Sequence, residues 1–363
     1  MEKMVVNAAF WKDKRVFVTG HTGFKGSWLV FWLESLGAKV KGYSLEPDTG
    51  PSLYRSISQK LNCESVTADI RDKITLDNHL RAFEPDIIFH LAAQPLVRAS
   101  YINPSETFEV NVVGTSNLLE SATRIHNTCT MVVITTDKVY QNNEWHYPYR
   151  ETDRLGGYDP YSASKAATEL VAESFRSSFF HPNDYSKHGK AIATARSGNV
   201  IGGGDYAKDR IVPDVVRALS QNTRISVRNP SAVRPWQHVL EPLSGYLLLA
   251  ELLHSNPSAY SQPYNFGPHI HDSLSVGQLV DKCIGVWGGG DVSHIQPVDA
   301  PHEAGLHRLD ISKSMNELGW RPKWDTSTAI ELTINWYKNS QKSQCGEYEL
   351  CLNDLNLFQA QIQ

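Results

Sequence analysis

The stretch Arg15-Val16-Phe17-Val18-Thr19-Gly20-His21-Thr22-Gly23-Phe24-Lys25-Gly26 predicts a β-strand, a glycine-rich turn and the start of a helix. The apolar run that follows, residues 27–36, is closed by Gly37, a typical helix C-terminus. Glycines let the backbone turn tightly and approach a pyrophosphate at the helix N-terminus. The spacing is Gly-x-x-Gly-x-x-Gly, and an ordinary turn is the alternative. We favour a dinucleotide site that comprises Gly20, Thr22, Gly23, Phe24, Lys25 and Gly26.

Strands and helices are expected to alternate from here to about residue 196. Further short β-branched or apolar runs, each a predicted strand, occur at 39–45, 65–69, 86–94, 131–138 and 191–196. This order predicts an α/β fold with a doubly wound parallel, Rossmann-type sheet. We expect a dinucleotide-binding domain over residues 1–196, a smaller substrate-binding lobe over 197–340 that is interleaved with it, and a tail over 341–363.

The second predicted strand bears on the choice of cofactor. NAD sites place an acid at its end, for the ribose; here Ser44 stands there and Glu46 comes slightly late. No arginine stands there for a 2′-phosphate, so NAD is favoured over NADP, with an affinity below the usual. Asp69 and Ile70 are candidates for holding the adenine, although Asp69 could instead cap a helix. The remaining candidates lie where a strand runs into small side chains that let a nicotinamide ribose approach: Leu91, Ala92, Ala93 and Gln94.

A second motif, Asp159-Pro160-Tyr161-Ser162-Ala163-Ser164-Lys165, predicts the start of another helix. Asp159 can cap its N-terminus, and Tyr161 and Lys165 then lie on one face, four residues apart. A free tyrosine titrates near pH ~10. A neighbouring ammonium and a cationic cofactor should lower the Tyr161 pKa and make it a base for a hydroxyl proton. Because Tyr-x-x-x-Lys often occurs by chance, the motif indicates a catalytic site only if the rest of the chain supplies a cofactor site and a substrate site.

The bulk properties exclude several classes of protein. The formal net charge of -4 gives no basic footprint for nucleic acid, and no apolar run has the roughly 18 residues of a membrane helix. Five cysteines without a Cys-x-x-Cys spacing indicate reduced thiols and a cytoplasmic location. No metal site is expected: His302 and His307 resemble a zinc-protease pair, but they lie five residues apart and do not share a helical face.

Together these motifs resemble the extended branch of the short-chain dehydrogenase/reductase superfamily, over roughly residues 14–338. Thr136-Asp137 resembles the nucleotide-sugar 4,6-dehydratases of that branch, in which an acid usually follows; here Lys138 replaces it. With residues 90–98 and 196–205, the segment Asp137–Tyr140 is similar to the CDP-D-glucose 4,6-dehydratases. No single residue specifies cytidine. The resemblance implies deoxysugar biosynthesis, as for a lipopolysaccharide O-antigen.

The resemblance also implies roles for the site residues. Tyr161 would take the proton of the glucose 4-hydroxyl while NAD⁺ accepts the C4 hydride, with Lys165 at the nicotinamide ribose and Thr136 at the 4-oxygen. Asp137 would then protonate the leaving 6-hydroxyl, and the hydride would return to C6. Lys138 occupies the position of the family's C5 base, and a neutral lysine can serve as one.

Substrate and subunit contacts follow from the same resemblance. Asn199, Arg210 and Arg234 would bind the nucleotide diphosphate, although Arg210 could instead form a surface salt bridge. A homodimer is expected through two long helices, residues 103–124 and 159–180.

Two alternatives remain open. One is another nucleotide-sugar enzyme of the branch, such as a dTDP- or GDP-sugar dehydratase, a decarboxylase or a 4-epimerase; an epimerase needs no acid at C6, so Asp137-Lys138 disfavours it. The other is a non-catalytic NAD-sensing protein, a class that commonly lacks the tyrosine or the lysine, both of which this chain has.

Overall fold

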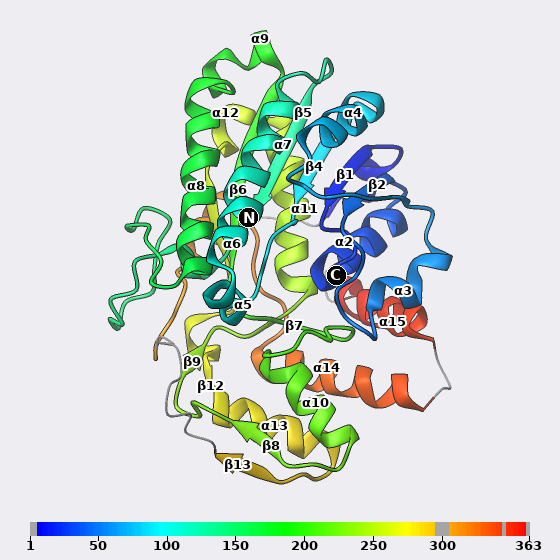
Figure 1. The fold of residues 1–363 in the computed structure, drawn as a ribbon, viewed down its shortest axis with the longest axis vertical. Helices are drawn as coiled ribbons and strands as arrows, with labels where there is room; N and C mark the ends of the chain where they lie inside the picture. Colours follow the sequence, from blue (N-terminus) through cyan, green and yellow to red (C-terminus); the bar gives the residue numbers. More distant parts are fainter. Residues whose placement is uncertain (1–5, 295–304, 343–345, 361–363) are drawn as a thin grey trace.

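A seven-stranded parallel sheet forms the centre of the computed structural model, which describes residues 6–294, 305–342 and 346–360 (Figure 1). The strand order is β11-β6-β5-β4-β1-β2-β3. The chain builds β1 to β3 on one side and then crosses to β4, so the strand order reverses between β1 and β4. The doubly wound sheet is thus confirmed. Its strands are β1 (Arg15–Thr19), β2 (Lys39–Ser44), β3 (Glu64–Thr67), β4 (Ile87–His90), β5 (Cys129–Ile134), β6 (Lys190–Ser197) and β11 (Pro263–Phe266).

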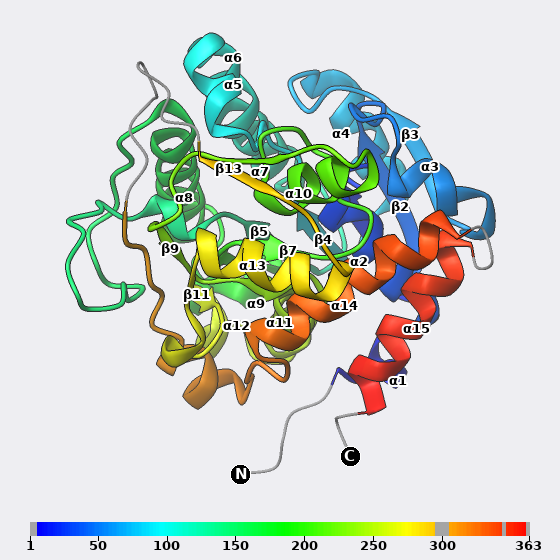
Figure 2. The same cartoon turned by 90° about the horizontal axis from the view of Figure 1, so that it is seen from below.

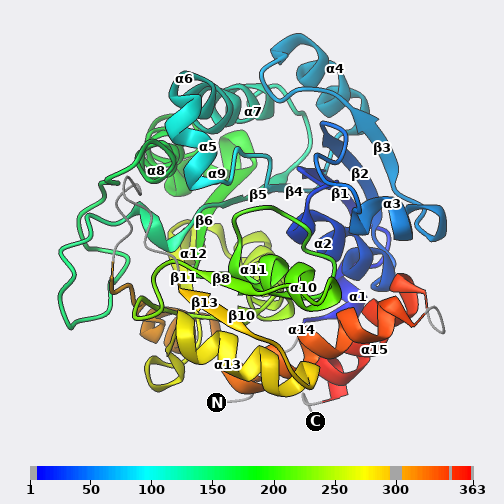
Figure 3. The same cartoon turned by 60° about the horizontal axis from the view of Figure 1, so that its bottom comes forward.

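The central strands are apolar because helices cover both faces of the sheet. In β1, Val16 and Val18 belong to one core cluster and Phe17 to the other. The helices α4 (Lys73–Phe83), α7 (Gly114–Ala122) and α8 (Pro160–Ser178) cover the face of Phe17. The helices α2 (Phe24–Ser35) and α11 (Leu240–Ser255) cover the opposite face (Figure 3).

The predicted helix over 103–124 runs from Pro104 to Ala122 and contains a π-helical turn. Its parts are α6 (Pro104–Phe108), the π turn Glu109–Val113 and α7. The π turn carries the buried Asn111, whose Nδ2 donates to Ser164 Oγ of α8 at 2.8 Å. Asn111 Oδ1 also accepts from the Gln94 backbone amide at 2.8 Å. The extra residue of the π turn therefore fastens α8 to the loop after β4.

A smaller lobe lies beyond the carboxyl ends of the strands (Figures 1 and 3). It contains α10 (Ile211–Ser220) and α13 (Val276–Trp287), which pack against each other. Three small strand pairs join it: β8 (Ile225–Val227) with β13 (Val292–His294), β9 (Val233–Arg234) with β12 (Leu274–Ser275), and β7 (Val200–Ile201) with β10 (Gln237–His238).

The segment after residue 340, which the sequence analysis leaves as a tail, contains a helix, α15 (Glu347–Ala360). α15 packs against α3 (Leu53–Ile57) and α14 (Thr326–Gln341), as Figure 2 shows, and buries Leu355 and Phe358. The remaining helices and helical turns are short: α1 (Ala8–Trp11), Ser58–Lys60, α5 (Val97–Ile102), Asp137–Val139, Pro182–Asp184, α9 (Tyr185–His188), α12 (Pro257–Tyr260), Ile270–Asp272 and Ser314–Leu318. Within the described ranges, no helix combines the length and the apolar character that a membrane span requires.

Candidate active site

A cavity of about 1220 Å³ lies between the carboxyl ends of the strands and the smaller lobe. The strand order reverses at this edge, between β1 and β4, where open α/β sheets bind their ligands. All residues predicted for the cofactor, the chemistry and the substrate line this cavity, with the exception of Gln94. The Gln94 side chain instead donates to Thr107 Oγ1 at 2.9 Å and accepts from the Leu96 amide at 2.6 Å, so it braces the loop that precedes α5.

The glycine turn fits the tight backbone packing of a dinucleotide site, because side chains at two of its glycines would collide with neighbouring backbone. Gly20 has φ +73°, and a Cβ there would lie 2.7 Å from the Ala92 nitrogen. A Cβ at Gly26 would collide with the Gly20 carbonyl oxygen. Gly23, the N-cap of α2, provides no side-chain hydrogen bond, so the amides of the first turn face the cavity end of the helix.

The end of the cavity beside β2 is lined by Glu46, the acid that comes slightly late after the second predicted strand. Glu46 lines the cavity and accepts from Thr67 Oγ1 at 2.9 Å, while Ser44 Oγ lies 2.9 Å from Thr22 Oγ1. Asp69 also lines it, and the Arg71 side chain hydrogen-bonds this carboxylate and lowers its pKa. Arg55 lies 3.8 Å from Glu46 but is not a lining residue.

Helix α8 presents Tyr161 and Lys165 to the cavity, as the motif predicts. Asp159 Oδ1 accepts from the Ser162 amide at 2.9 Å and so caps the helix. Lys165 Nζ donates to the Ile134 carbonyl at the end of β5, at 3.1 Å. Burial lowers the Lys165 pKa to about 8, against the charge of Glu169 one turn further on.

The prediction that the ammonium and a cationic cofactor together lower the Tyr161 pKa stays a prediction, and the chain alone shifts this pKa in the opposite direction. Burial raises this pKa to about 12, against a hydrogen bond with the Thr136 side chain and the charge of Arg210. Tyr161 is only 9% exposed, and Lys165 directs its ammonium to a carbonyl. Desolvation of the phenolate therefore outweighs the cations that the protein itself supplies.

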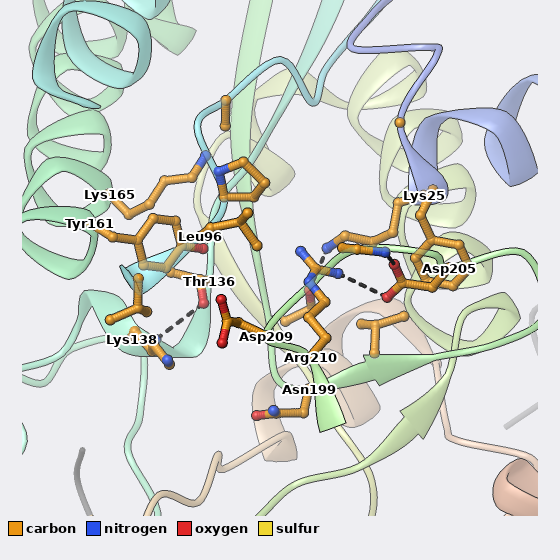
Figure 4. A pocket seen from close by; sticks show the side chains of 18 of the residues that line it. Lys25, Leu96, Thr136, Lys138, Tyr161, Lys165, Asn199, Asp205, Asp209 and Arg210 are labelled. Atoms are coloured by element: carbon orange, nitrogen blue, oxygen red, sulfur yellow. Dashed lines mark hydrogen bonds and ion pairs between the residues drawn. The ribbon is translucent and has the colours of Figure 1, made fainter. Parts of the chain in front are cut away.

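The helical turn Asp137–Val139 follows β5 and carries the predicted dehydration residues. Asp137 is 2% exposed, and its Oδ1 accepts from Thr136 Oγ1 at 2.9 Å. No hydrogen-bond partner of its Oδ2 is found within the described ranges. Lys138 is half-buried and lines the cavity. Figure 4 shows Thr136, Lys138, Tyr161 and Lys165 together on one side of the cavity.

Two of the predicted phosphate residues, Asn199 and Arg210, lie across from this group in Figure 4, and the third, Arg234, lines the same cavity. Arg210 is held by Asp205 at 3.2 Å, and Arg234 Nη1 donates to the Val233 carbonyl at 2.9 Å. Lys25 extends from α2 toward the same region and donates to Ser197 Oγ at 3.2 Å (Figure 4). Burial, together with Arg210 and Lys165, lowers the Lys25 pKa to about 7. Asn199 lines the cavity beside them.

The sequence analysis missed His307, which it considered only as a metal ligand. Its Nε2 donates to the Asp137 carbonyl oxygen at 2.8 Å, and the side chain lines the cavity. His302, the other half of the rejected metal motif, lies outside the described residues. No periodicity or spacing in the sequence connects His307 with Asp137, since 170 residues separate them.

Comparison with known proteins finds nucleotide-sugar 4,6-dehydratases at the level of family, sequence and structure. The family model for GDP-mannose 4,6 dehydratase matches residues 17–333. A CDP-glucose 4,6-dehydratase of Salmonella typhimurium is 48% identical over 92% of this chain and 93% of its own length. A dTDP-glucose 4,6-dehydratase of Streptomyces antibioticus is 30% identical over 90% of this chain and 93% of its own length. Among solved structures, a dTDP-glucose 4,6-dehydratase of Streptomyces venezuelae with NAD bound has a TM-score of 0.77 and 25% identity, over 90% of this chain and 98% of that one.

Proposed function

Because this chain belongs to the GDP-mannose 4,6-dehydratase family of nucleotide-sugar enzymes, we propose that it converts CDP-D-glucose to CDP-4-keto-6-deoxy-D-glucose. The observation that carries this function is the meeting of Tyr161, Lys165 and Asp137 in one cavity. A base for oxidation and an acid for loss of water then act on the same sugar. The relative with 48% identity supports glucose carried by CDP.

The cofactor is NAD, which the glycine turn, Ala92 and Glu46 would hold. When bound, NAD⁺ accepts the hydride from C4 of the sugar and gives it back at C6. A Cβ at Gly26 would collide with the Gly20 carbonyl oxygen, so the two ends of the glycine turn pack closely against each other. Glu46 supplies the acceptor for a ribose hydroxyl, which favours NAD over its 2′-phosphorylated form.

The first task of the chain is to take the proton of the 4-hydroxyl. Tyr161 lies near Thr136, with which it shares a hydrogen bond, so one side chain can orient the 4-oxygen while the other takes its proton. The ammonium of Lys165 and the positive charge of the nicotinamide both favour the phenolate. Lys165 is within reach of a ribose hydroxyl, because it lines the same cavity.

The second task is the loss of water across C5 and C6. The 4-ketone acidifies the C5 proton, which the neutral amine of Lys138 accepts. The C–O bond at C6 breaks, and Asp137 gives its proton to the leaving hydroxide, so that water departs. After the hydride has returned to C6, the amine returns the proton to C5. Tyr161 then holds the proton of the 4-hydroxyl and Asp137 has lost one, so the transfer of one proton from Tyr161 to Asp137 through solvent restores the enzyme.

The diphosphate of the substrate would bind in the same cavity, at Arg210, Arg234, Asn199 and Lys25. Guanidinium groups suit this task because they give several directed donors to phosphate oxygens. Asp205 fixes Arg210 within the cavity wall, which argues against a merely exposed ion pair.

A homodimer is part of the proposal. Four large apolar side chains are exposed along α5, α6, the π turn and α8, where the family pairs its subunits: Ile102 (77%), Phe108 (38%), Val113 (50%) and Leu170 (61%). These elements pack side by side on one flank of the molecule (Figure 1). Burial against a second copy would remove this flank from water.

The proposed function is tested by supplying CDP-, dTDP-, GDP- and UDP-glucose with catalytic NAD⁺ and measuring 4-keto-6-deoxy product. We expect product from CDP-glucose, over many turnovers per NAD⁺ and without net NADH. Stoichiometric NADH would indicate a simple dehydrogenase, and a C4 epimer with its 6-hydroxyl intact would indicate an epimerase. In Asp137→Asn, oxidation should persist while loss of water slows by about 10²–10⁴-fold, so bound NADH should accumulate.

A further inference from the structure

His307 reaches the active site from the smaller lobe and is fixed there by aromatic packing. The adjacent Leu306 forms a β-bridge with Val233. The imidazole is 5% exposed and stacks on Tyr149, with ring centroids 5.3 Å apart and an angle of 26° between the planes. Tyr149 in turn stacks on Tyr140 at 5.3 Å. The ring therefore has little freedom to move.

The contact with the Asp137 carbonyl defines which ring nitrogen of His307 carries the hydrogen. Nε2 lies 2.8 Å from the Asp137 carbonyl oxygen, which can only accept, so Nε2 carries a hydrogen. Burial lowers the His307 pKa, although Asp137 opposes the shift, so the ring is neutral at pH 7. The same Nε2 is 3.8 Å from Asp137 Oδ2, too far for a hydrogen bond.

The consequence concerns the two oxygens of the Asp137 carboxyl group. Thr136 Oγ1 donates to Oδ1, whereas Oδ2 is buried without a partner in the part of the chain that the structure describes. A buried oxygen without a donor is the one that gains most from carrying a proton. Because His307 gives its hydrogen to the main chain, it leaves Oδ2 available.

We propose that His307 is a positioning residue for the loss of water: it holds the peptide that links Asp137 to Lys138, and so aims the acid and the base at C6 and C5. The inference rests on the proposed role of Asp137. Rotation of this peptide would displace both side chains at once, and His307 Nε2 donates a hydrogen bond to its carbonyl. Oxidation, which depends on Tyr161, needs no such support.

A comparison with another buried histidine distinguishes this role from core packing. His90 uses both ring nitrogens on threonines, Thr19 at 2.7 Å and Thr115 at 2.9 Å, and it does not line the cavity. His307 directs its donor at the residue next to the chemistry and does line the cavity. The two histidines therefore predict different results on substitution.

The test compares two variants of the full-length enzyme. His307→Phe retains a ring for stacking on Tyr149 but has no donor, whereas His307→Gln retains an N–H at the end of a side chain of similar reach. In rapid mixing with CDP-glucose, His307→Phe should form NADH at the wild-type rate and lose it about 10- to 10²-fold more slowly, the effect of a misplacement near 1 Å. kcat should fall while KM stays unchanged, and His307→Gln should recover most of the loss.

A double-mutant cycle decides whether His307 acts through Asp137. Asp137→Asn/His307→Phe should be slowed by less than the product of the two single losses, because the acid is already absent and only the misplacement of Lys138 remains. Multiplied losses in the double variant, equal slowing of NADH formation and decay, or no recovery in His307→Gln would each overturn the inference. Unchanged NAD affinity by calorimetry and an unchanged melting temperature exclude a general loss of structure; should His307→Phe not fold, His307→Met takes its place. Absence of 4-keto-6-deoxy product from the wild type would instead refute the proposed function.

Discussion

The pH dependence of C4 oxidation should break at the pKa of Lys165, not at that of Tyr161. In the proposed mechanism, the productive pair is a Tyr161 phenolate beside a Lys165 ammonium. Burial raises the first pKa to about 12 and lowers the second to about 8. At pH 7 the lysine is therefore mostly protonated, while the phenol is ionised in only about 10⁻⁵ of the molecules, a free-energy gap of about 7 kcal/mol.

Below pH ~8 the rate of oxidation should rise about tenfold per pH unit, because the phenolate fraction does. Above that value the ammonium fraction falls by the same factor, so the product of the two fractions becomes constant. The plateau holds about 10⁻⁴ of the enzyme in the productive form, since four units separate the two pKa values. The charge of NAD⁺ lowers both values and moves the break to a lower pH without reversing their order.

The assay is the initial NADH burst in rapid mixing with CDP-glucose, from about pH 6 to about pH 10. Lys165→Met preserves length and packing but has no titrating group, so its slower burst should rise with pH throughout this range. The reasoning is refuted if Lys165→Met retains the break, or if the wild-type rate falls above its break instead of levelling off.

Three further predictions concern the cofactor, the subunits and the fold. Gly26→Ala should weaken NAD binding in calorimetry by about tenfold or more, since overpacking costs about 1–3 kcal/mol. Gly23→Ala is the control: its Cβ would lie 3.4 Å from the Gly20 oxygen, so it should bind NAD nearly normally. Equal losses of affinity in the two variants would contradict this prediction. Leu170→Lys should sediment as a folded monomer where the wild type is a dimer; a dimeric variant would place the interface elsewhere. Burial raises the Asp354 pKa to about 7, so the folded state binds a proton that the unfolded state has lost between pH ~4 and pH ~7, and stability falls as pH rises through this window. Asp354→Asn should therefore gain up to about 4 kcal/mol in urea unfolding at pH 8 and much less at pH 5; an equal gain at both values would argue against the titration.

Local patterns were sufficient to predict six of the seven strands of the sheet, because each of these six is a short β-branched or apolar run next to a turn. Strand β11 was missed because Pro263–Phe266 has only four residues and begins with proline. Its strand character comes from pairing with β6, where Tyr264 lies opposite Ala195. Helix α15 was missed for a similar reason: its order depends on burial against α3 and α14, which lie far away in sequence.

Motifs predicted which residues line the cavity, because glycine spacing and the Tyr161–Lys165 pair are local. They did not predict the neighbours that hold those residues. Asn111 reaches Ser164 only because a π turn shifts its register within the helix. His307 reaches Asp137 only because the smaller lobe folds back over the sheet.

The protonation state of Tyr161, the proposed base, was the least predictable feature, and the reason is physical. Spacing places Lys165 one helical turn from Tyr161, but the effect of a charge depends on where its atoms point. Lys165 donates to the Ile134 carbonyl, and the protein charge that opposes the rise of the Tyr161 pKa comes from Arg210, on the far side of the cavity. Arg210 is also a proposed ligand of the diphosphate, and a bound anion would offset its charge at the phenol. A substrate that arrives without NAD⁺ would therefore leave Tyr161 harder to ionise, whereas the cationic nicotinamide supplies the missing charge, so oxidation requires both ligands together.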